Sequence, residues 1–286
     1  MASRRQRRKK KQDFLGITGI VTVLLIGVGI FYFANQATDP LDENNCSVKD
    51  GPTGVTAIVF DKSYPYAPEQ VTDIRTSFNL WLSGKEATTK NRRIDLNFFS
   101  EGTLVQLYVT DNKLVNAIGG LEPLAELCVP RDFEDANPLI SNPALLEKSY
   151  RNFIQTFTDE LDKLLEVEEG ISPIMETFIR LSNSESFQNH PEKPHNLFII
   201  SDMLQNSDNY SHYSSGEGPS WDNFEEKMKG TVYMRPRLNQ VKWQVFFAKR
   251  SDPREKQLQS TELTNFWQQF FYNANAVPAD WILIDG

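Results

Sequence analysis

The chain has 286 residues, of which 40% are hydrophobic and 12% aromatic. That apolar content is sufficient for a sizeable core and excludes a chain that is disordered throughout. The formal net charge is −8, but seven Lys and Arg side chains lie within Arg4–Lys11, and removing them from the total leaves −15 for the rest. The two parts of the chain are therefore suited to different environments.

Directly after the basic cluster, residues 14–34 (FLGITGIVTVLLIGVGIFYFA) contain no charged side chain over 21 positions. As a helix this segment would be about 31 Å long, which matches the hydrocarbon core of a bilayer. We predict a retained transmembrane helix here, preceded by a basic tail at residues 1–13. A cleaved signal peptide would have a shorter apolar core and a small residue in place of Asn35, and a buried core helix would show a polar face.

The charges on either side of the predicted span indicate its orientation. Seven basic residues precede it, whereas residues 35–45 are acidic and contain no Lys or Arg. Because positive flanks stay inside, we expect a cytoplasmic amino end and a periplasmic or otherwise extracytoplasmic domain. Membrane topology and anionic lipids account for the basic run, so no nucleic-acid partner is expected.

Residues 35–53 are rich in Asp, Asn, Gly and Pro, which predicts a linker between the membrane and the domain. The two cysteines of the chain, Cys46 and Cys128, would both lie on the oxidising side of the membrane. A disulfide between them is therefore permitted. Sequence alone leaves open whether they pair or stay as free thiols.

Residues 54–286 predict one α/β domain, because short apolar runs alternate with helical patterns. The expected architecture is a doubly wound, mostly parallel sheet, with the first strand next to the strand at 196–201. Strands are expected at residues 55–60, 103–109, 196–201, 241–248 and 281–284, with a short one near 124–129; helices are expected at 70–82, 143–166, 173–182, after Ser220 and at 261–275.

Oxygen-bearing side chains gather where these strands end. Asp61 and Ser63 follow the first strand, Ser201 ends the strand at 196–201 and Asp202 follows it, and Ser172 lies at the entry to the helix before that strand. In such sheets, ligands bind at the carboxyl ends of the strands. Carboxylate and hydroxyl oxygens suit hard cations such as Mg²⁺, Mn²⁺ or Ca²⁺.

The order of these residues resembles the von Willebrand factor A domain and its metal-ion-dependent adhesion site, over roughly residues 53–286. The matching positions are Asp61 and Ser63 in the first loop, Ser172 for the loop threonine, and Asp202 for the late aspartate. The resemblance implies that the two serines touch Mg²⁺ or Mn²⁺ and that the two aspartates hold it largely through waters. It also implies that an acidic side chain of a protein partner completes the coordination.

One position departs from the family's pattern. Its second serine falls at Pro65, which has no side-chain oxygen, so an ion would need an additional water or would bind weakly. Lys62 and Tyr64 border the site and are the residues expected to contact a partner.

Each site residue also has a purely structural interpretation. Asp61 and Ser63 could stabilise a turn or cap the following helix, and Asp202 could serve a turn at its strand end. Ser172 precedes Pro173 and could be a helix N-cap. All of these interpretations at once would be a larger coincidence than any one alone, which favours a site.

No catalytic signature accompanies these residues. GxSxG, P-loop and GxGxxG motifs are absent, and the three histidines, His190, His195 and His212, lie in polar segments without further zinc ligands. We therefore expect a protein-binding or scaffold module that is not an enzyme. A structural subunit with a decayed ion site, and a metal-dependent hydrolase using Asp61 and Asp202, are the alternatives.

Overall fold

The computed structural model describes residues 18, 20–29, 40–84, 96–111, 120–132, 142–166, 170–214, 218–234 and 236–284. A six-stranded sheet with the order β3-β2-β1-β4-β5-β6 forms its centre. Only the β2–β3 pair is antiparallel. The predicted α/β class with a mostly parallel sheet is thus confirmed. The strands are β1 (Gly54–Phe60), β2 (Thr103–Val109), β3 (Ala125–Cys128), β4 (His195–Ser201), β5 (Lys242–Ala248) and β6 (Val277–Ile284).

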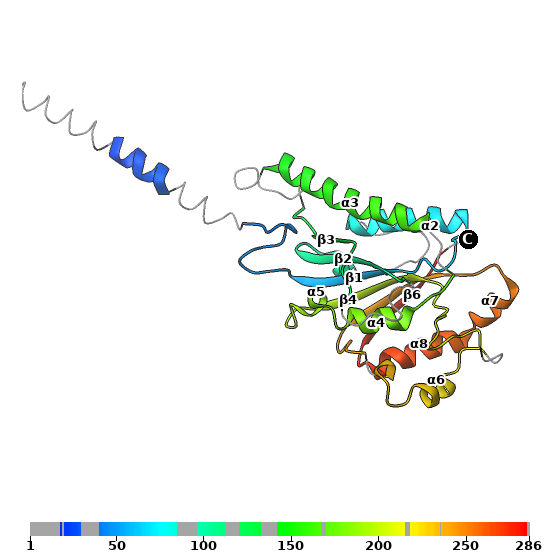
Figure 1. The fold of residues 1–286 in the computed structure, drawn as a ribbon. Coiled ribbons are helices and arrows are strands. Elements are labelled where there is room, and N and C mark those ends of the chain that lie inside the picture. Colours follow the sequence, from blue (N-terminus) through cyan, green and yellow to red (C-terminus); the bar gives the residue numbers. More distant parts are fainter. Residues whose placement is uncertain are drawn as a thin grey trace, which may run out of the picture.

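Helices cover both faces of the sheet (Figure 1). Two long helices, α2 (Pro68–Leu82) and α3 (Pro143–Leu165), pack on one face together with the short 3₁₀ helix η1 (Leu96–Phe99). The opposite face is covered by α4 (Ile174–Leu181), α6 (Trp221–Met228) and α8 (Thr261–Asn273). The remaining short helices are α5 (Glu185–Gln188), η3 (Val232–Met234) and α7 (Pro253–Leu258).

The central strand β1 is apolar except for Thr56, whose hydroxyl donates to the Phe98 carbonyl, because both of its faces are covered. Val55, Ala57 and Val59 pack into the core beneath α4 and α8, whereas Ile58 and Phe60 pack into the core beneath α2 and α3. All five side chains are fully buried. The continuous apolar run, without polar alternation, is typical of a strand inside a parallel sheet.

The pairing that matters most for function is between β1 and β4. They run in parallel with Phe60 opposite Ile200, and Ile200 in turn is opposite Phe246 of β5. The prediction that the first strand lies beside the strand at 196–201 is confirmed. Residues that follow β1, β4 and β5 consequently emerge at the same edge, here called the carboxyl edge.

Helix α3 begins as its sequence predicts. The side chain of Asn142 accepts a hydrogen bond from the backbone N–H of Ala144 at 3.1 Å, and Pro143 occupies the first helical position. This arrangement satisfies an amide that the helix itself leaves unpaired, and proline loses no hydrogen bond there. The helix then runs to Leu165, close to the predicted end.

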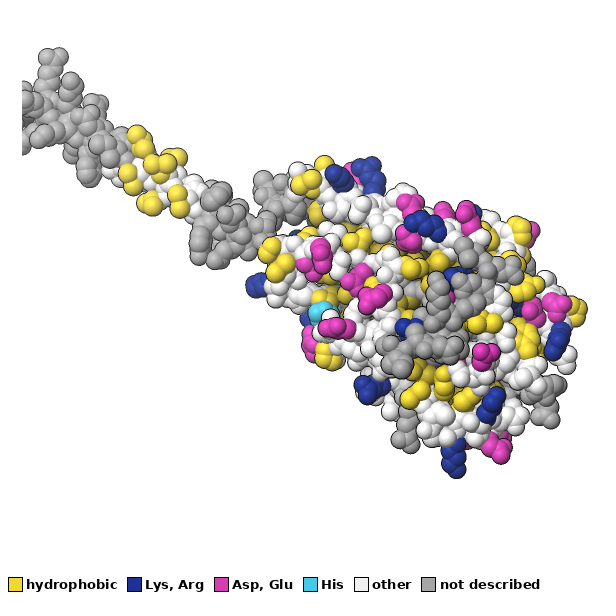
Figure 2. Space-filling model, in the orientation of Figure 1, with side chains coloured by type: hydrophobic (Ala, Val, Ile, Leu, Met, Phe, Trp, Pro, Cys, Tyr) yellow, Lys and Arg dark blue, Asp and Glu magenta, His cyan; other side chains and the backbone are white. Residues whose placement is uncertain are grey.

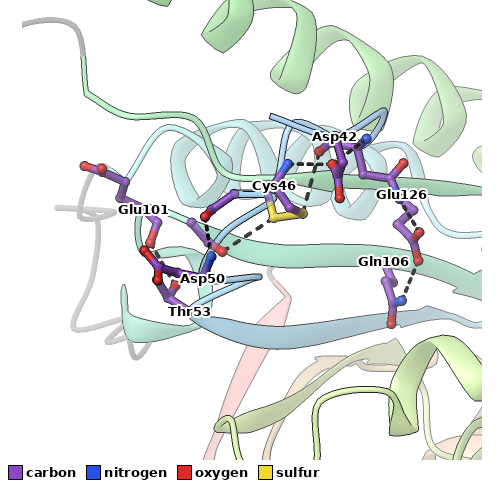
Figure 3. Close-up of a disulfide and its surroundings, with 11 residues drawn as sticks. Asp42, Cys46, Asp50, Thr53, Glu101, Gln106 and Glu126 are labelled. Atoms are coloured by element: carbon purple, nitrogen blue, oxygen red, sulfur yellow. Dashed lines mark hydrogen bonds between the residues drawn. A yellow bond between two sulfur atoms is a disulfide. The ribbon is translucent and has the colours of Figure 1, made fainter. Parts of the chain in front are cut away.

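Residues 40–53, part of the predicted linker, pack against the domain (Figure 3). A disulfide joins Cys46 to Cys128 of β3, with the two Cα atoms 5.1 Å apart. The Asn44 side chain donates to Glu126 at 2.7 Å, and the backbone N–H of Cys128 donates to the Asn44 carbonyl at 2.8 Å. Gln106 of β2 donates to the same Glu126 carboxylate. A free linker would make none of these contacts, so the ordered domain begins before β1.

Thr18 and residues 20–29, within the predicted span, are helical. Their large apolar side chains are between 48% and 69% exposed. Figure 2 shows them in yellow along the described part of this helix. Over the described residues, no helix is long and apolar enough to cross a membrane. The basic tail at residues 1–13 and the rest of the predicted span lie outside the described residues.

Candidate functional site

Four adjacent strands deliver polar side chains to the carboxyl edge. Thr110 follows β2, Asp61 follows β1, Asp202 follows β4, and Arg250 comes two residues after the end of β5. These strands are consecutive in the sheet order. Side chains up to 189 positions apart in the chain, from Asp61 to Arg250, therefore meet in one small volume.

Asp61 is the centre of this cluster and is 2% exposed. Its Oδ1 accepts hydrogen bonds from the Ser63 backbone N–H at 3.1 Å and from the Thr110 hydroxyl at 2.9 Å. Its Oδ2 accepts from the hydroxyls of Ser172 at 2.9 Å and Ser201 at 2.7 Å. A carboxylate offers about four lone-pair sites. All four are therefore occupied by donors of the chain itself.

Ser172 reaches Asp61 because its backbone is fixed against a neighbouring segment. It exchanges two backbone hydrogen bonds with Asn206, at 2.8 and 2.9 Å. Helix α4 starts two residues later, and the residue at its N-cap position is Pro173. The interpretation of Ser172 as a helix N-cap is thus wrong, because its hydroxyl serves Asp61.

Asp202 is paired with a cation of the chain. Its Oδ1 accepts from the Leu204 backbone N–H at 2.8 Å, and its Oδ2 accepts from Nε of Arg250 at 2.5 Å. The two side chains are 3% and 4% exposed. Burial, with a smaller effect of the nearby Asp61, outweighs the stabilising charge of Arg250 and raises the pKa of Asp202 to about 6. The carboxylate is therefore still ionised at pH 7.

The turn after β4 is rigidly held. Met203 has a φ of 60°, a left-handed conformation that is uncommon for residues other than glycine. The Ser201 hydroxyl accepts from the Met203 backbone N–H at 2.8 Å, and the Trp267 indole donates to the Met203 carbonyl at 2.7 Å. Such conformations persist where the surroundings over-determine them, and they are frequent at functional sites.

Aromatic side chains cover the charged pair. The Arg250 guanidinium lies 4.1 Å from the ring centre of Tyr64 and 6.0 Å from that of Tyr66. The Tyr66 hydroxyl donates to the Asp61 carbonyl at 2.7 Å, and burial, followed by the charge of Asp61, raises the Tyr66 pKa. Tyr64 remains 41% exposed, and Pro65 is exposed beside it. The surface directly over the charged pair is thus aromatic and apolar.

The structure brings the four predicted metal-site residues, Asp61, Ser63, Ser172 and Asp202, close together. Asp61, Ser63 and Ser172 are in direct hydrogen-bond contact, and Asp202 lies near enough to Asp61 for the two charges to interact. Of the two residues expected to contact a partner, Tyr64 lies on the surface, whereas Lys62 is only 9% exposed.

The donors present do not fit a divalent ion. Asp61 has no free acceptor site, Asp202 is already neutralised by Arg250, and Pro65 offers no oxygen. Among the described residues, no group of three or more His, Cys, Asp or Glu side chains is placed to hold a metal. An ion at this edge would have to displace these hydrogen bonds and lie beside a buried guanidinium.

Two contributors were not assigned by the sequence, Thr110 and Arg250. Thr110 directly follows the apolar strand β2, so a search of every strand end for hydroxyls would have included it. Arg250 follows the apolar run of β5, but nothing in the sequence pairs it with Asp202.

Comparisons with known proteins give little further information. No family model matches the chain, and no curated protein matches it. Among solved structures, it is similar to the human COPII-coat protein Sec24c at 9% sequence identity and a TM-score of 0.38. The alignment covers 82% of this chain and only 30% of that one. At this level the similarity carries no argument about function.

Proposed function

We propose that the chain is a membrane-anchored, extracytoplasmic protein-binding module of the von Willebrand factor A type, which holds a partner within an envelope complex. The observation that carries this proposal is the convergence of Asp61, Ser172, Ser201 and Asp202 at one edge of the sheet. Such an edge is the usual ligand site of open α/β sheets.

The A-type assignment is supported by architecture as well as by residues. The loops after β1 and β4 carry the two aspartates, and the loop before α4 supplies the serine, in the order that the resemblance requires. The core sheet is mostly parallel and covered by helices on both faces. Those features suit a rigid platform that presents loops to a partner.

The anchor is supported by the chemistry of the amino-terminal segment. The described part of the predicted span is helical and exposes apolar side chains, from Ile20 to Val28. A hydrocarbon environment would cover these side chains. The preceding basic cluster favours a cytoplasmic amino end, and the Cys46–Cys128 disulfide is in keeping with an oxidising compartment.

The partner is expected to touch the exposed part of the carboxyl edge at Tyr64 and Pro65. Tyrosine provides a large contact area with few rotatable bonds, which is why it is common at interfaces. A structural subunit of a membrane complex is the second candidate. It is favoured by Pro65, which stands where an ion site has a serine, and by the buried Arg250–Asp202 pair, in which a guanidinium occupies the aspartate.

Photo-crosslinking in membranes tests the proposal. A photoreactive phenylalanine analogue is placed at position 64 of the full chain, and in a second variant at position 272. Tyr272 is 72% exposed and lies in the last turn of α8, which ends shortly before the start of β6 at the opposite edge, so it is a matched control. We expect a discrete crosslinked protein from position 64 and none from position 272. Equal crosslinking at both positions, or none at position 64, would reject the carboxyl edge as the binding surface.

A further inference from the structure

We propose that Arg250 supplies from within the chain the positive charge that a divalent cation supplies in the domains this one resembles, so that the carboxyl edge is formed without a metal ion. This inference deepens the proposed function and rests on it for the role of the edge in binding. The neutralisation itself is a property of the folded chain.

The position of Arg250 is fixed by a neighbouring side chain. Gln259, at the end of α7, accepts a hydrogen bond from the Arg250 backbone N–H at 2.7 Å. Its amide donates to the carbonyl of Asp202 at 3.0 Å and to the carbonyl of Ala248 at 2.8 Å. One side chain therefore holds the backbones of both partners of the ion pair. The pair is preorganised and does not depend on two flexible side chains meeting by chance.

The charge balance of the edge favours the same conclusion. The edge contains two buried carboxylates: Asp61 is 2% exposed and Asp202 is 3% exposed. An uncompensated charge is strongly unfavourable in such an interior position. Asp61 is compensated by four hydrogen bonds, and Asp202 by Arg250 and one backbone N–H. A divalent cation would add positive charge next to a guanidinium that is already in place, and the two would repel each other.

The surface consequence concerns the partner. Arg250 is 6% exposed and its guanidinium lies beneath the Tyr64 ring, so it offers no open position to a carboxylate of another protein. Directly beside the pair, the accessible side chains are Tyr64 and Pro65. Tyr64 and Pro65 thus offer a contact to an apolar or aromatic segment of a partner, whereas Arg250 offers none to the acidic side chain that an ion site recruits.

Thermal unfolding of the full chain in neutral detergent, followed by tryptophan fluorescence, tests this inference. Each protein is measured in EDTA and then with MgCl₂ or MnCl₂ at matched ionic strength. We expect the Tm of the wild type to be unchanged by either ion. Arg250→Ala should lower the Tm by several degrees in EDTA, and Mn²⁺ should restore at least half of the loss, because two buried carboxylates are then left for an ion.

Three further variants make the experiment decisive. Arg250→Ala combined with Asp202→Asn should lose the response to Mn²⁺. Arg75→Ala is the matched control, because Arg75 pairs with Asp162 at 2.6 Å on the surface and its removal should leave the Tm nearly unchanged. If Arg250→Ala does not fold, Arg250→Gln retains a hydrogen-bond donor without the charge and takes its place.

Two results would overturn the inference. One is a saturable stabilisation of the wild type by Mn²⁺ that disappears in Asp202→Asn, and the other is an Arg250→Ala protein as stable as the wild type in EDTA. Crosslinking from position 64, measured in EDTA and in Mg²⁺, tests this inference and the proposed function separately. A crosslink that requires Mg²⁺ contradicts the inference alone, whereas no crosslink under any condition contradicts the proposed binding function alone.

Discussion

The hydroxyl of Ser201 donates to Oδ2 of Asp61 at 2.7 Å, across the pairing of β1 with β4. The same hydroxyl accepts from the Met203 backbone N–H at 2.8 Å, so one buried oxygen joins the central carboxylate to the turn after β4. The Ser201 hydroxyl therefore connects the end of β1 to the turn after β4.

Replacing Ser201 by Ala should lower the free energy of unfolding by about 2 to 3 kcal/mol, because a charged acceptor and a backbone donor each lose a buried partner. The measurement is urea unfolding of the full chain in neutral detergent. Ser214→Ala is the control: the exposed Ser214 hydroxyl donates to the nearby Ser211 carbonyl, and its loss should change stability by less than about 0.5 kcal/mol. Equal effects at the two positions would contradict the role given to Ser201.

Replacing Tyr64 by Ala should destabilise the domain by about 1 kcal/mol, because the ring contributes a cation–π contact to the partly desolvated Arg250 guanidinium at 4.1 Å. Tyr64→Phe keeps the ring and should be nearly neutral. The two variants are compared by urea unfolding at pH 7. A Phe variant as unstable as the Ala variant would show that the hydroxyl, and not the ring, stabilises the edge.

Asp202 should make the domain less stable as the pH rises from about 4 to 6. Its folded pKa of about 6 lies above the ordinary value of 3.8, so the folded state holds the proton more tightly in that window. The contribution present below the ordinary pKa is lost by pH 7. The stability of the wild type relative to Asp202→Asn should therefore be lower at pH 7 than at pH 4, by about 2 kcal/mol. An ordinary surface ion pair would give the opposite trend.

His212 should make the domain more stable as the pH rises, in contrast to Asp202. Burial lowers its pKa to about 3, and its Nδ1 accepts from the Gln205 backbone N–H at 3.1 Å, so the folded state excludes the proton that the unfolded chain takes up below pH 6.5. Its stabilising contribution is complete above that pH and falls by about 1.4 kcal/mol per unit as the pH drops toward 3. His212→Asn keeps an acceptor and should remove about 2 kcal/mol of the loss seen between pH 7 and pH 5. The same substitution at the partly exposed His190 is the control.

Reduction of the Cys46–Cys128 disulfide should lower the free energy of unfolding by about 4 kcal/mol, because the bridge closes a loop with a sequence separation of 82. Urea unfolding with and without dithiothreitol measures this change. The double variant Cys46→Ser with Cys128→Ser should have the stability of the reduced protein and be insensitive to the reductant. A wild type that is equally stable in both conditions would show that the hydrogen bonds of Asn44 alone hold the segment.

The sequence predicted those features that follow from local pattern and from the geometry of parallel sheets. The apolar runs of β1 and β4 indicated buried central strands, and strand order then placed Asp61 and Asp202 at one edge. The Asn142–Pro143 pair located the start of α3 because capping depends on adjacent residues only.

Features that depend on long-range contact could not be predicted in this way. Arg250 is an ordinary base in the sequence, and only the neighbouring position of β5 brings it to Asp202. Residues 40–53 have the composition of a linker, and their packing follows from a disulfide and from Glu126 on a distant strand. The antiparallel direction of the short strand β3 likewise leaves no mark on its four residues.

The disulfide has a mechanical consequence. Cys128 lies opposite Leu104, near the start of β2, whereas Tyr64 follows the finish of β1. Force applied at residue 46 therefore acts on the sheet near the start of β2, and force applied at Tyr64 acts near the end of β1. Tension between the two runs lengthwise along the strands, where many backbone hydrogen bonds must shear together and none can be unzipped singly. A load between the disulfide and Tyr64 is thus directed along the strands of the sheet.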